Sequence, residues 1–343
     1  MNLINKNIHN SIHFTILTSR RAVYEFIMKK SFMICFIVFF LSAISNQIFS
    51  QADISMVTHW NNRANYNPAS IARQGYVYLF SNIRNQWTGI AGSPQVINVQ
   101  ASGFSENLNS GFGISLVADK IGLTQVLNPM LSYAFRIVDK NENAFAMGVS
   151  AGVFGRGLNG TGYNPEDLSD PFLNYMDVNS IRPDANVGFE FQSRYFVAGL
   201  STTHLFSIGN DSLFLNSNHR YGYLIFKNTD SELFNYHFGV QCVNRSSIFI
   251  VEGNAGIRYK HPTGLSKGAR EIFDVGITYR STKQLSLLFG IMLTSDLRAG
   301  YAFDKSFIAG YQANSTHEIM LEYRIPVKEL NCKTCRNSDF WYH

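Results

Sequence analysis

The sequence predicts an all-β transmembrane barrel of the outer-membrane type, with about fourteen antiparallel strands. Three observations predict it. A secretory signal lies near the start, and the chain after it has few charged residues but no long apolar run. Apolar residues also alternate with small or polar ones along the chain. Charged residues make up 15% of the chain and aromatic residues 14%, whereas soluble domains carry nearer a quarter charged residues. Strands that turn apolar side chains to lipid and small or polar ones inward have this composition, and helical membrane proteins do not.

Residues 1–50 are predicted to form an N-terminal extension followed by a signal peptide over about 28–50. Lys29-Lys30 precede the apolar run 31–41, and small or polar residues follow that run. The run is too short to span a membrane as a helix, which needs about 20 apolar residues. The extension ahead of the signal favours a misassigned start codon over a functional segment. We expect residues 51–74 to be a periplasmic segment that precedes the barrel.

Strands are predicted wherever apolar residues recur at every second position. In the segment 273–280 every odd position is apolar or aromatic and every even position is small or polar. This period of two is the signature of a strand with two unlike faces. Fourteen segments carry the pattern, some of them weakly: 75–83, 95–102, 111–118, 131–137, 144–154, 185–192, 195–203, 218–226, 234–242, 248–258, 273–280, 285–293, 296–304 and 317–324.

A barrel over 75–325, with a C-terminal tail at 326–343, explains these strands better than a soluble sandwich. The set is too large for one sandwich, and no linker divides it into two. The polar face is rich in Gly, Ser, Thr and Ala, as in a crowded, hydrated lumen. Short links alternate with long ones, and parity from a periplasmic N-terminus places the long segments 155–184 and 204–217 on the outer side.

Several charged residues fall on the predicted inward face. Facing lipid at mid-depth, an arginine would cost about 2–4 kcal/mol, so we expect these residues to pair across the lumen. Such a network either narrows or plugs the lumen or merely solvates it, and both possibilities stay open. The residues are Arg136, Glu190, Asp274, Arg280 and Arg298.

Aromatic residues lie at or near the predicted strand ends. Their amphipathic rings suit the headgroup level of a bilayer, so they are candidates for interfacial girdles. Simple core packing is the alternative. The residues are Trp60, Tyr66, Trp87, Tyr133, Tyr279, Tyr301 and Tyr323.

Several segments resemble, in order, the PorP/SprF family of outer-membrane components of the type IX secretion system. They cover nearly all of the mature chain: Asn67-Pro68-Ala69, Arg84–Ile90 with Gly92 and Pro94, Gly111–Leu116, Asp119–Gly122, Tyr195–Ser201, His204-Leu205, Arg298–Tyr301 and His317–Leu321. The Arg-Asn-Gln-Trp stretch at 84–87 and the His-Glu-Ile-Met-Leu stretch at 317–321 are specific, and the others are weak alone. The tail after Ile325 departs from the family pattern, which leaves its role open.

This resemblance implies a barrel needed for the export or surface attachment of cargo that carries a type IX C-terminal signal domain, including adhesins of gliding bacteria. Implied partners are the other type IX secretion components, the cargo and outer-membrane lipid. The net charge of +5 forms no basic stripe, so we expect no nucleic-acid partner. The alternative function is a passive outer-membrane channel or small-molecule transporter.

Two loops, 84–94 and 155–184, are the predicted contact regions for partners or cargo. Glycine and proline turn geometry can hold the side chains of the first loop in place, and the second loop is the largest. The candidate contact residues, with two from the 119–122 motif, are Arg84, Asn85, Gln86, Trp87, Asp119, Lys120, Asn164 and Asp167.

The sequence carries no convincing enzymatic motif, and we expect no cofactor and no metal. The G-x-G-x-x-G match at 155–160 precedes no helix, which favours a flexible loop. The G-x-S-x-G match at 148–152 lies within a predicted strand, which favours a serine facing the lumen. Cys332 and Cys335 form a C-x-x-C pair without a second ligand pair, so a small disulfide loop or a plain tail is favoured over chemistry.

Overall fold

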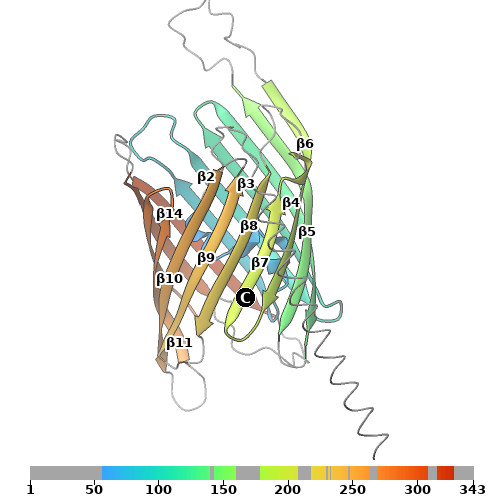
Figure 1. The fold of residues 1–343 in the computed structure, drawn as a ribbon, viewed down its shortest axis with the longest axis vertical. Helices are drawn as coiled ribbons and strands as arrows, with labels where there is room; N and C mark the ends of the chain where they lie inside the picture. Colours follow the sequence, from blue (N-terminus) through green and yellow to red (C-terminus); the bar gives the residue numbers. More distant parts are fainter. Residues whose placement is uncertain are drawn as a thin grey trace, which may run out of the picture. The chain divides into compact units, whose positions relative to one another are not determined.

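A computed structural model describes residues 56–139, 143–159, 178–207, 218–228, 231, 233–245, 248–262, 269–307 and 315–327. All of them belong to one compact unit, 50–343. Fourteen antiparallel strands form a closed barrel (Figure 1). The strands are β1 (Tyr76–Asn85), β2 (Gln95–Ser105), β3 (Ser110–Ile121), β4 (Thr124–Val138), β5 (Ala144–Leu158), β6 (Val178–Gln192), β7 (Phe196–Thr203), β8 (His219–Asn228), β9 (Phe234–Arg245), β10 (Ile248–Pro262), β11 (Ala269–Arg280), β12 (Gln284–Met292), β13 (Leu297–Ser306) and β14 (Ser315–Pro326).

The barrel closes by pairing its first strand with its last. Each strand pairs with the next along the chain, and β1 also pairs antiparallel with β14, so that Arg84 lies opposite Glu318. Closure removes both sheet edges, as a barrel surrounded by lipid requires. The predicted all-β barrel with about fourteen strands is confirmed, and each predicted segment overlaps one observed strand.

The strands β5 and β6 extend further than the sequence pattern indicated. Their ladder continues to the pair Leu158 and Val178, so most of the flanks of the predicted loop 155–184 are strand. The pattern missed this part because glycine, arginine and asparagine interrupt the apolar alternation there. Pro183 interrupts it too, but in a stretch of β6 whose second edge is not paired with β7, where a missing N–H is tolerated.

The two faces of the wall differ as the alternation predicts. On β11, the side chains of Phe273, Val275 and Ile277 are exposed on the outer surface, whereas Asp274 and Thr278 are buried. The exposed outer side chains are apolar on strand after strand, up to Ile181 on β6 at 75% exposure. This surface has the apolar character that acyl chains require.

Residues 56–74 lie inside the barrel rather than ahead of it, which differs from the expected periplasmic segment at 51–74. The segment forms three short 3-10 helices, η1 (Thr58–Trp60), η2 (Arg63–Asn65) and η3 (Pro68–Ile71). Asn62 and Asn67 cap the second and third by accepting the N–H groups of residues two positions later. Figure 1 shows this blue segment within the ring of strands. A fourth, η5 (Leu205–Ser207), follows β7.

The buried apolar clusters all join this segment to the wall. Trp60 and Tyr66 pack with residues of β7 to β10, Ile71 packs among alanines of β4 and β5, and Val57 packs on Leu288. Trp60 and Tyr66 therefore belong to the lumen core and not to an interfacial girdle. Within the described ranges, no helix is long and apolar enough to cross a membrane.

Candidate functional site

The N-terminal plug, residues 56–74, is held by carboxylates of the barrel wall. Glu318 on β14 accepts the backbone N–H groups of Val57, at 2.7 Å, and Thr58, at 3.1 Å. The same carboxylate pairs with Arg84 on β1. One buried acidic side chain therefore links the start of the plug to the seam of the barrel.

A second wall carboxylate, Glu190 on β6, holds the middle of the plug. Its oxygen lies 2.9 Å from Nε of Arg63 and also accepts the hydroxyl of Tyr223. Asn67 donates to Tyr223 at 2.8 Å. Burial acts to lower the pKa of Arg63, but the adjacent Glu190 outweighs it and the pKa is raised. The Arg63 guanidinium is therefore a permanent cation inside the lumen.

A third wall carboxylate, Glu252 on β10, binds aromatic side chains of the plug. It accepts the indole N–H of Trp60 and lies 2.9 Å from Nε2 of His59. Its other oxygen accepts Nε of Arg280 at 2.7 Å. The plug is thus fixed on three sides of the barrel. The groups that fix it are almost fully buried, apart from the partly buried His59. All of them are hydrogen-bonded or ion-paired, as buried charges in proteins must be.

Glycines in the wall make room for the plug backbone. A Cβ at Gly148 would lie 2.4 Å from the nitrogen of Ala69, and one at Gly188 would lie 2.0 Å from Oδ1 of Asn67. Gly111 and Gly239 face Ile71 and Trp60 in the same way. These contacts are too short for any side chain, so the wall and the plug are complementary in shape.

The predicted lumen charges take two different roles. Arg298 on β13 binds Asp274 on β11, at 2.6 Å, and Glu322 on β14, so it links its own strand to the adjacent β14 and to β11, two strands away. Arg136 on β4 donates instead to the backbone oxygen of Ala72 in the plug, at 2.9 Å. Glu190 and Arg280 contact the plug or its partners as described for the wall carboxylates. All five predicted lumen charges therefore have buried or partly buried positions on the inner face.

A cavity of about 380 Å³ lies between the plug and the wall, and we call it the vestibule. Its floor is formed by Met56, His59, Asn65 and Tyr66 of the plug. Most of its wall residues lie near the strand ends opposite to the end that carries Tyr76 and Pro326: Asp119, Thr124, Arg156, Thr203, Arg245, Ile250 and Arg280. The vestibule is thus on the far side of the plug from the two termini of the barrel.

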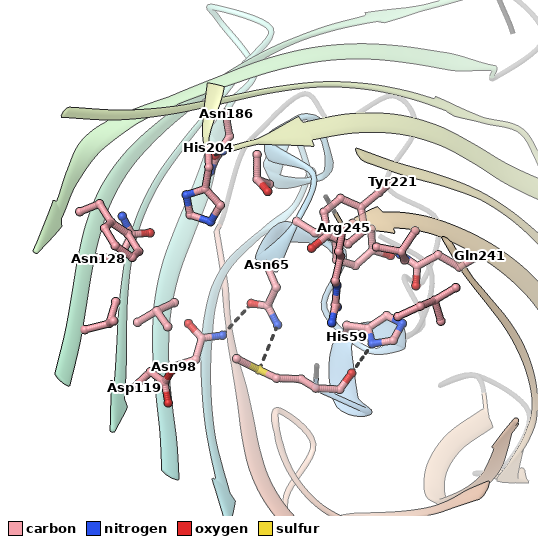
Figure 2. Close-up of a pocket in the computed structure, with 18 of the residues that line it drawn as sticks. His59, Asn65, Asn98, Asp119, Asn128, Asn186, His204, Tyr221, Gln241 and Arg245 are labelled. Carbon is pink, nitrogen blue, oxygen red and sulfur yellow. Dashed lines mark hydrogen bonds between the residues drawn. The ribbon is translucent and has the colours of Figure 1, made fainter. Parts of the chain in front are cut away.

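Five carboxamide side chains contribute to the inner surface of the vestibule. Figure 2 shows Asn65, Asn98, Asn128, Asn186 and Gln241 around it. Nδ2 of Asn98 donates to Oδ1 of Asn65 at 2.7 Å, which joins the wall to the plug. His204, whose ring lies 2.8 Å from Asp184, also lines the cavity. Such a surface can offer hydrogen-bond donors and acceptors side by side.

Arg84, predicted as a contact residue of an outer loop, is instead a lumen residue. Its guanidinium is buried and binds Glu318 and Asp304. The strand β1 continues to Asn85, so only the residues after it form the loop. Arginine in a family-like motif was read as a contact because the sequence does not show which face of a strand end is covered.

The other residues predicted with Arg84 as contacts, at the end of β1 and in the loop after it, keep accessible positions. Asn85 is exposed and Gln86 and Trp87 are half-buried. The backbone N–H of Trp87 donates to Thr316 at 3.4 Å, and the N–H of Gly122 donates to Gly92 at 2.9 Å, so the loop is tied to β14 and to the turn after β3. Asn164 and Asp167 lie outside the described residues.

The two contact residues predicted near the end of β3 lie on opposite faces of the strand. Asp119 lines the vestibule, and Lys120 is exposed on the opposite face. Ser150, from the G-x-S-x-G match, faces the lumen and lies 2.7 Å from the hydroxyl of Ser132. In the part of the chain that the structure describes, no group of three His, Cys, Asp or Glu could hold a metal. Cys332 and Cys335 fall outside that part.

Several outer-membrane proteins of known structure are similar in fold. They include Omp33 of Acinetobacter baumannii (8% identity, 73% of this chain and 98% of that chain, TM-score 0.44). The CymD monoaromatic hydrocarbon channel is similar too, with 13% identity over 83% of this chain and 96% of that chain and a TM-score of 0.47. The toluene transporter TbuX of Ralstonia pickettii has 12% identity over 76% of this chain and 92% of that chain and a TM-score of 0.46. A search of curated proteins found no match. These scores are low, and the barrel assignment rests on the strand pairing itself.

A protein family matches most of the chain. Residues 48–323 match the family described as type IX secretion system membrane protein PorP/SprF. This match confirms the resemblance carried by the sequence motifs, and a closed barrel with an apolar exterior belongs in the outer membrane. The chain belongs to the PorP/SprF family of type IX secretion system membrane proteins.

Proposed function

We propose that this outer-membrane barrel supports the export or surface attachment of cargo proteins with a type IX C-terminal signal domain, such as gliding adhesins, and does so without catalysis. The observation that carries the proposal is the plug in a barrel of this family. A lumen filled by residues 56–74 suits a protein that works through its surfaces and its partners. Other components of the secretion system are the expected partners.

The two ends of the barrel suit different partners. The longest connections, 159–177 and 204–218, join strands at the end that holds the vestibule. Long connections face outward in bacterial barrels, so this end is assigned to the cell surface, where cargo is displayed. The opposite end carries Tyr76 and Pro326 and would face the periplasmic components. The exposed strand-end residues Asn85 and Lys120, with the half-buried loop residues Gln86 and Trp87, remain candidate contacts for cargo.

A passive channel is the second candidate, but the plug disfavours it. Hydrogen bonds from β2, β4, β6, β8, β10 and β14 reach the segment 56–74. A solute could pass only if those contacts opened. Flux of small solutes through the purified protein in liposomes would favour the channel.

Deletion of the chain, followed by proteomics of the secreted and surface fractions, tests the proposal. We expect one or a few cargo proteins with the C-terminal signal domain to disappear from the surface, while the uptake of small antibiotics stays unchanged. Restoring the wild-type chain should restore the cargo. Unchanged cargo together with reduced uptake of a small solute would refute the secretion role and favour the channel.

A further inference from the structure

Among the buried polar atoms without a hydrogen-bond partner within the described part of the chain, four belong to Tyr, Asn, Thr and Gln side chains around the vestibule. They are Oη of Tyr66 in the plug, Oδ1 of Asn98 on β2, Oγ1 of Thr203 on β7 and Nε2 of Gln241 on β9. A buried group left without a partner costs about 1–3 kcal/mol. Such groups are rare in proteins, and a molecule bound in this cavity would supply partners for these four.

Gln241 is the most informative of them. Its side chain is 1% exposed, and Nε2 of its carboxamide has no hydrogen-bond partner among the described residues. A glutamine that only filled space would be replaced without loss by leucine, which is about the same size. The carboxamide therefore requires a partner that enters the vestibule.

Two asparagines add hydrogen-bonding groups to the same cavity. Asn186 accepts the N–H of His204 with its oxygen, which leaves its NH2 group available. Asn128 donates to Val153 and Asp184 with its NH2 group, which leaves its oxygen available. Donor and acceptor groups are thus both present on the wall, and Figure 2 shows Asn128 and Asn186 among the residues that line the cavity. A hydroxyl group both donates and accepts, so a ligand with several hydroxyls matches this surface.

The charge and the size of the vestibule further limit the kinds of ligand that fit it. The lining holds three arginines, Arg156, Arg245 and Arg280, and two carboxylates, Asp119 and Glu252, so its formal charges nearly balance. A volume of about 380 Å³ falls within the size range of small-molecule sites. The plug closes the floor, and therefore an extended polypeptide cannot thread through. A compact, neutral ligand or the end of a chain fits.

We propose that the vestibule binds a neutral saccharide of one or two sugar units, either free or as the terminal part of a surface glycan. The carboxamides of Asn128, Asn186 and Gln241 and the hydroxyls of Tyr66 and Thr203 would contact its hydroxyl groups. This site goes beyond the secretion role and does not depend on it.

The test uses the purified full-length chain in a polyoxyethylene detergent, which contains no sugar. The protein is applied to a glycan array whose termini include neutral hexoses, N-acetylhexosamines, deoxyhexoses and charged hexuronates. The best neutral terminus is then titrated as a free disaccharide by calorimetry. Binding only on the array would identify a glycan end as the ligand, and equal binding in solution would identify the free sugar.

Three variants separate the vestibule from the rest of the lumen. Gln241→Leu and Thr203→Val remove cavity groups with little change of size, and each should weaken binding by about tenfold, the equivalent of one lost hydrogen bond. Ser201→Ala is the matched control, because its buried hydroxyl also has no described partner but does not line the cavity. It should bind like the wild type. Each variant is first checked for folding by its heat-dependent migration on a gel.

Three results would overturn the proposal. They are the absence of neutral glycans from the bound set, binding of hexuronates alone, and binding by both cavity variants that is as tight as that of Ser201→Ala. The first of these would mean that ordered water alone satisfies the polar groups. None of the three would bear on cargo export, which is measured separately in the deletion strain.

Discussion

Arg84 and Glu318, 234 positions apart in the chain, form a buried ion pair between the first and last strands. The same carboxylate accepts the N–H groups of Val57 and Thr58. Closure of the barrel and attachment of the plug therefore share one side chain. A change at Glu318 should affect both.

Glu318→Ala is expected to destabilise the barrel. It leaves Arg84 buried with only Asp304, at 3.4 Å, as a carboxylate partner, and the loss of one partner of a buried pair costs about 3–5 kcal/mol. The urea midpoint of the folded band on a gel measures this. Asp296→Ala removes a carboxylate from an exposed turn and is the control. Equal midpoints for the two variants would contradict the shared role of Glu318.

Gly148→Ala is expected to displace the plug without unfolding the wall. Its Cβ would lie 2.4 Å from the nitrogen of Ala69, whereas a Cβ at Gly253 would have nothing within 4 Å. Trypsin should therefore cut after Arg63 or Arg73 in Gly148→Ala, because both arginines are buried in the native plug. Gly253→Ala is the control and should resist trypsin like the wild type. Equal resistance of both variants would contradict the close contact between wall and plug.

Replacement of 160–177 by a short glycine-serine link is expected to reduce surface cargo. The segment holds Asn164 and Asp167, and the strands on either side of it are left intact. Removal of 309–313 at the same end of the barrel is the control for shortening a loop. Proteomics of the surface fraction measures cargo, and full export by the first variant would exclude this loop as a cargo contact.

We propose a disulfide between Cys332 and Cys335, which lie outside the described residues. The oxidising environment beyond the inner membrane favours a bond across so short a spacing. Both thiols should resist alkylation until a reductant is added. Cys242, a half-buried free thiol on β9, serves as the internal reference. Alkylation of Cys332 and Cys335 without reductant would show that the pair is not a disulfide.

The wall of this protein is predictable from sequence because a strand between lipid and lumen must alternate. Phe273, Asp274 and Val275 identify their faces without any other information, since one side must meet acyl chains. The ends of the strands are less predictable. The ladder of β5 and β6 continues past Gly155 because backbone pairing does not depend on the side chains that carry the pattern.

The plug was not predictable from local pattern, because it has none. Its 3-10 turns lack a period, and its asparagines look like residues of a solvated segment. Trp60 and Tyr66 resemble girdle residues for the same reason. Two signals in the sequence do point to it: inward carboxylates such as Glu190 and Glu318 need partners, and inward glycines such as Gly148 leave space that something must fill.

The conductance of the purified protein in planar bilayers tests the plugged lumen most directly. The full chain should show almost no ion current, and a variant that lacks 56–72 should show a steady current, because the contacts to Glu190, Glu252 and Glu318 would be gone. A full chain that conducts as well as the deletion variant would contradict the account.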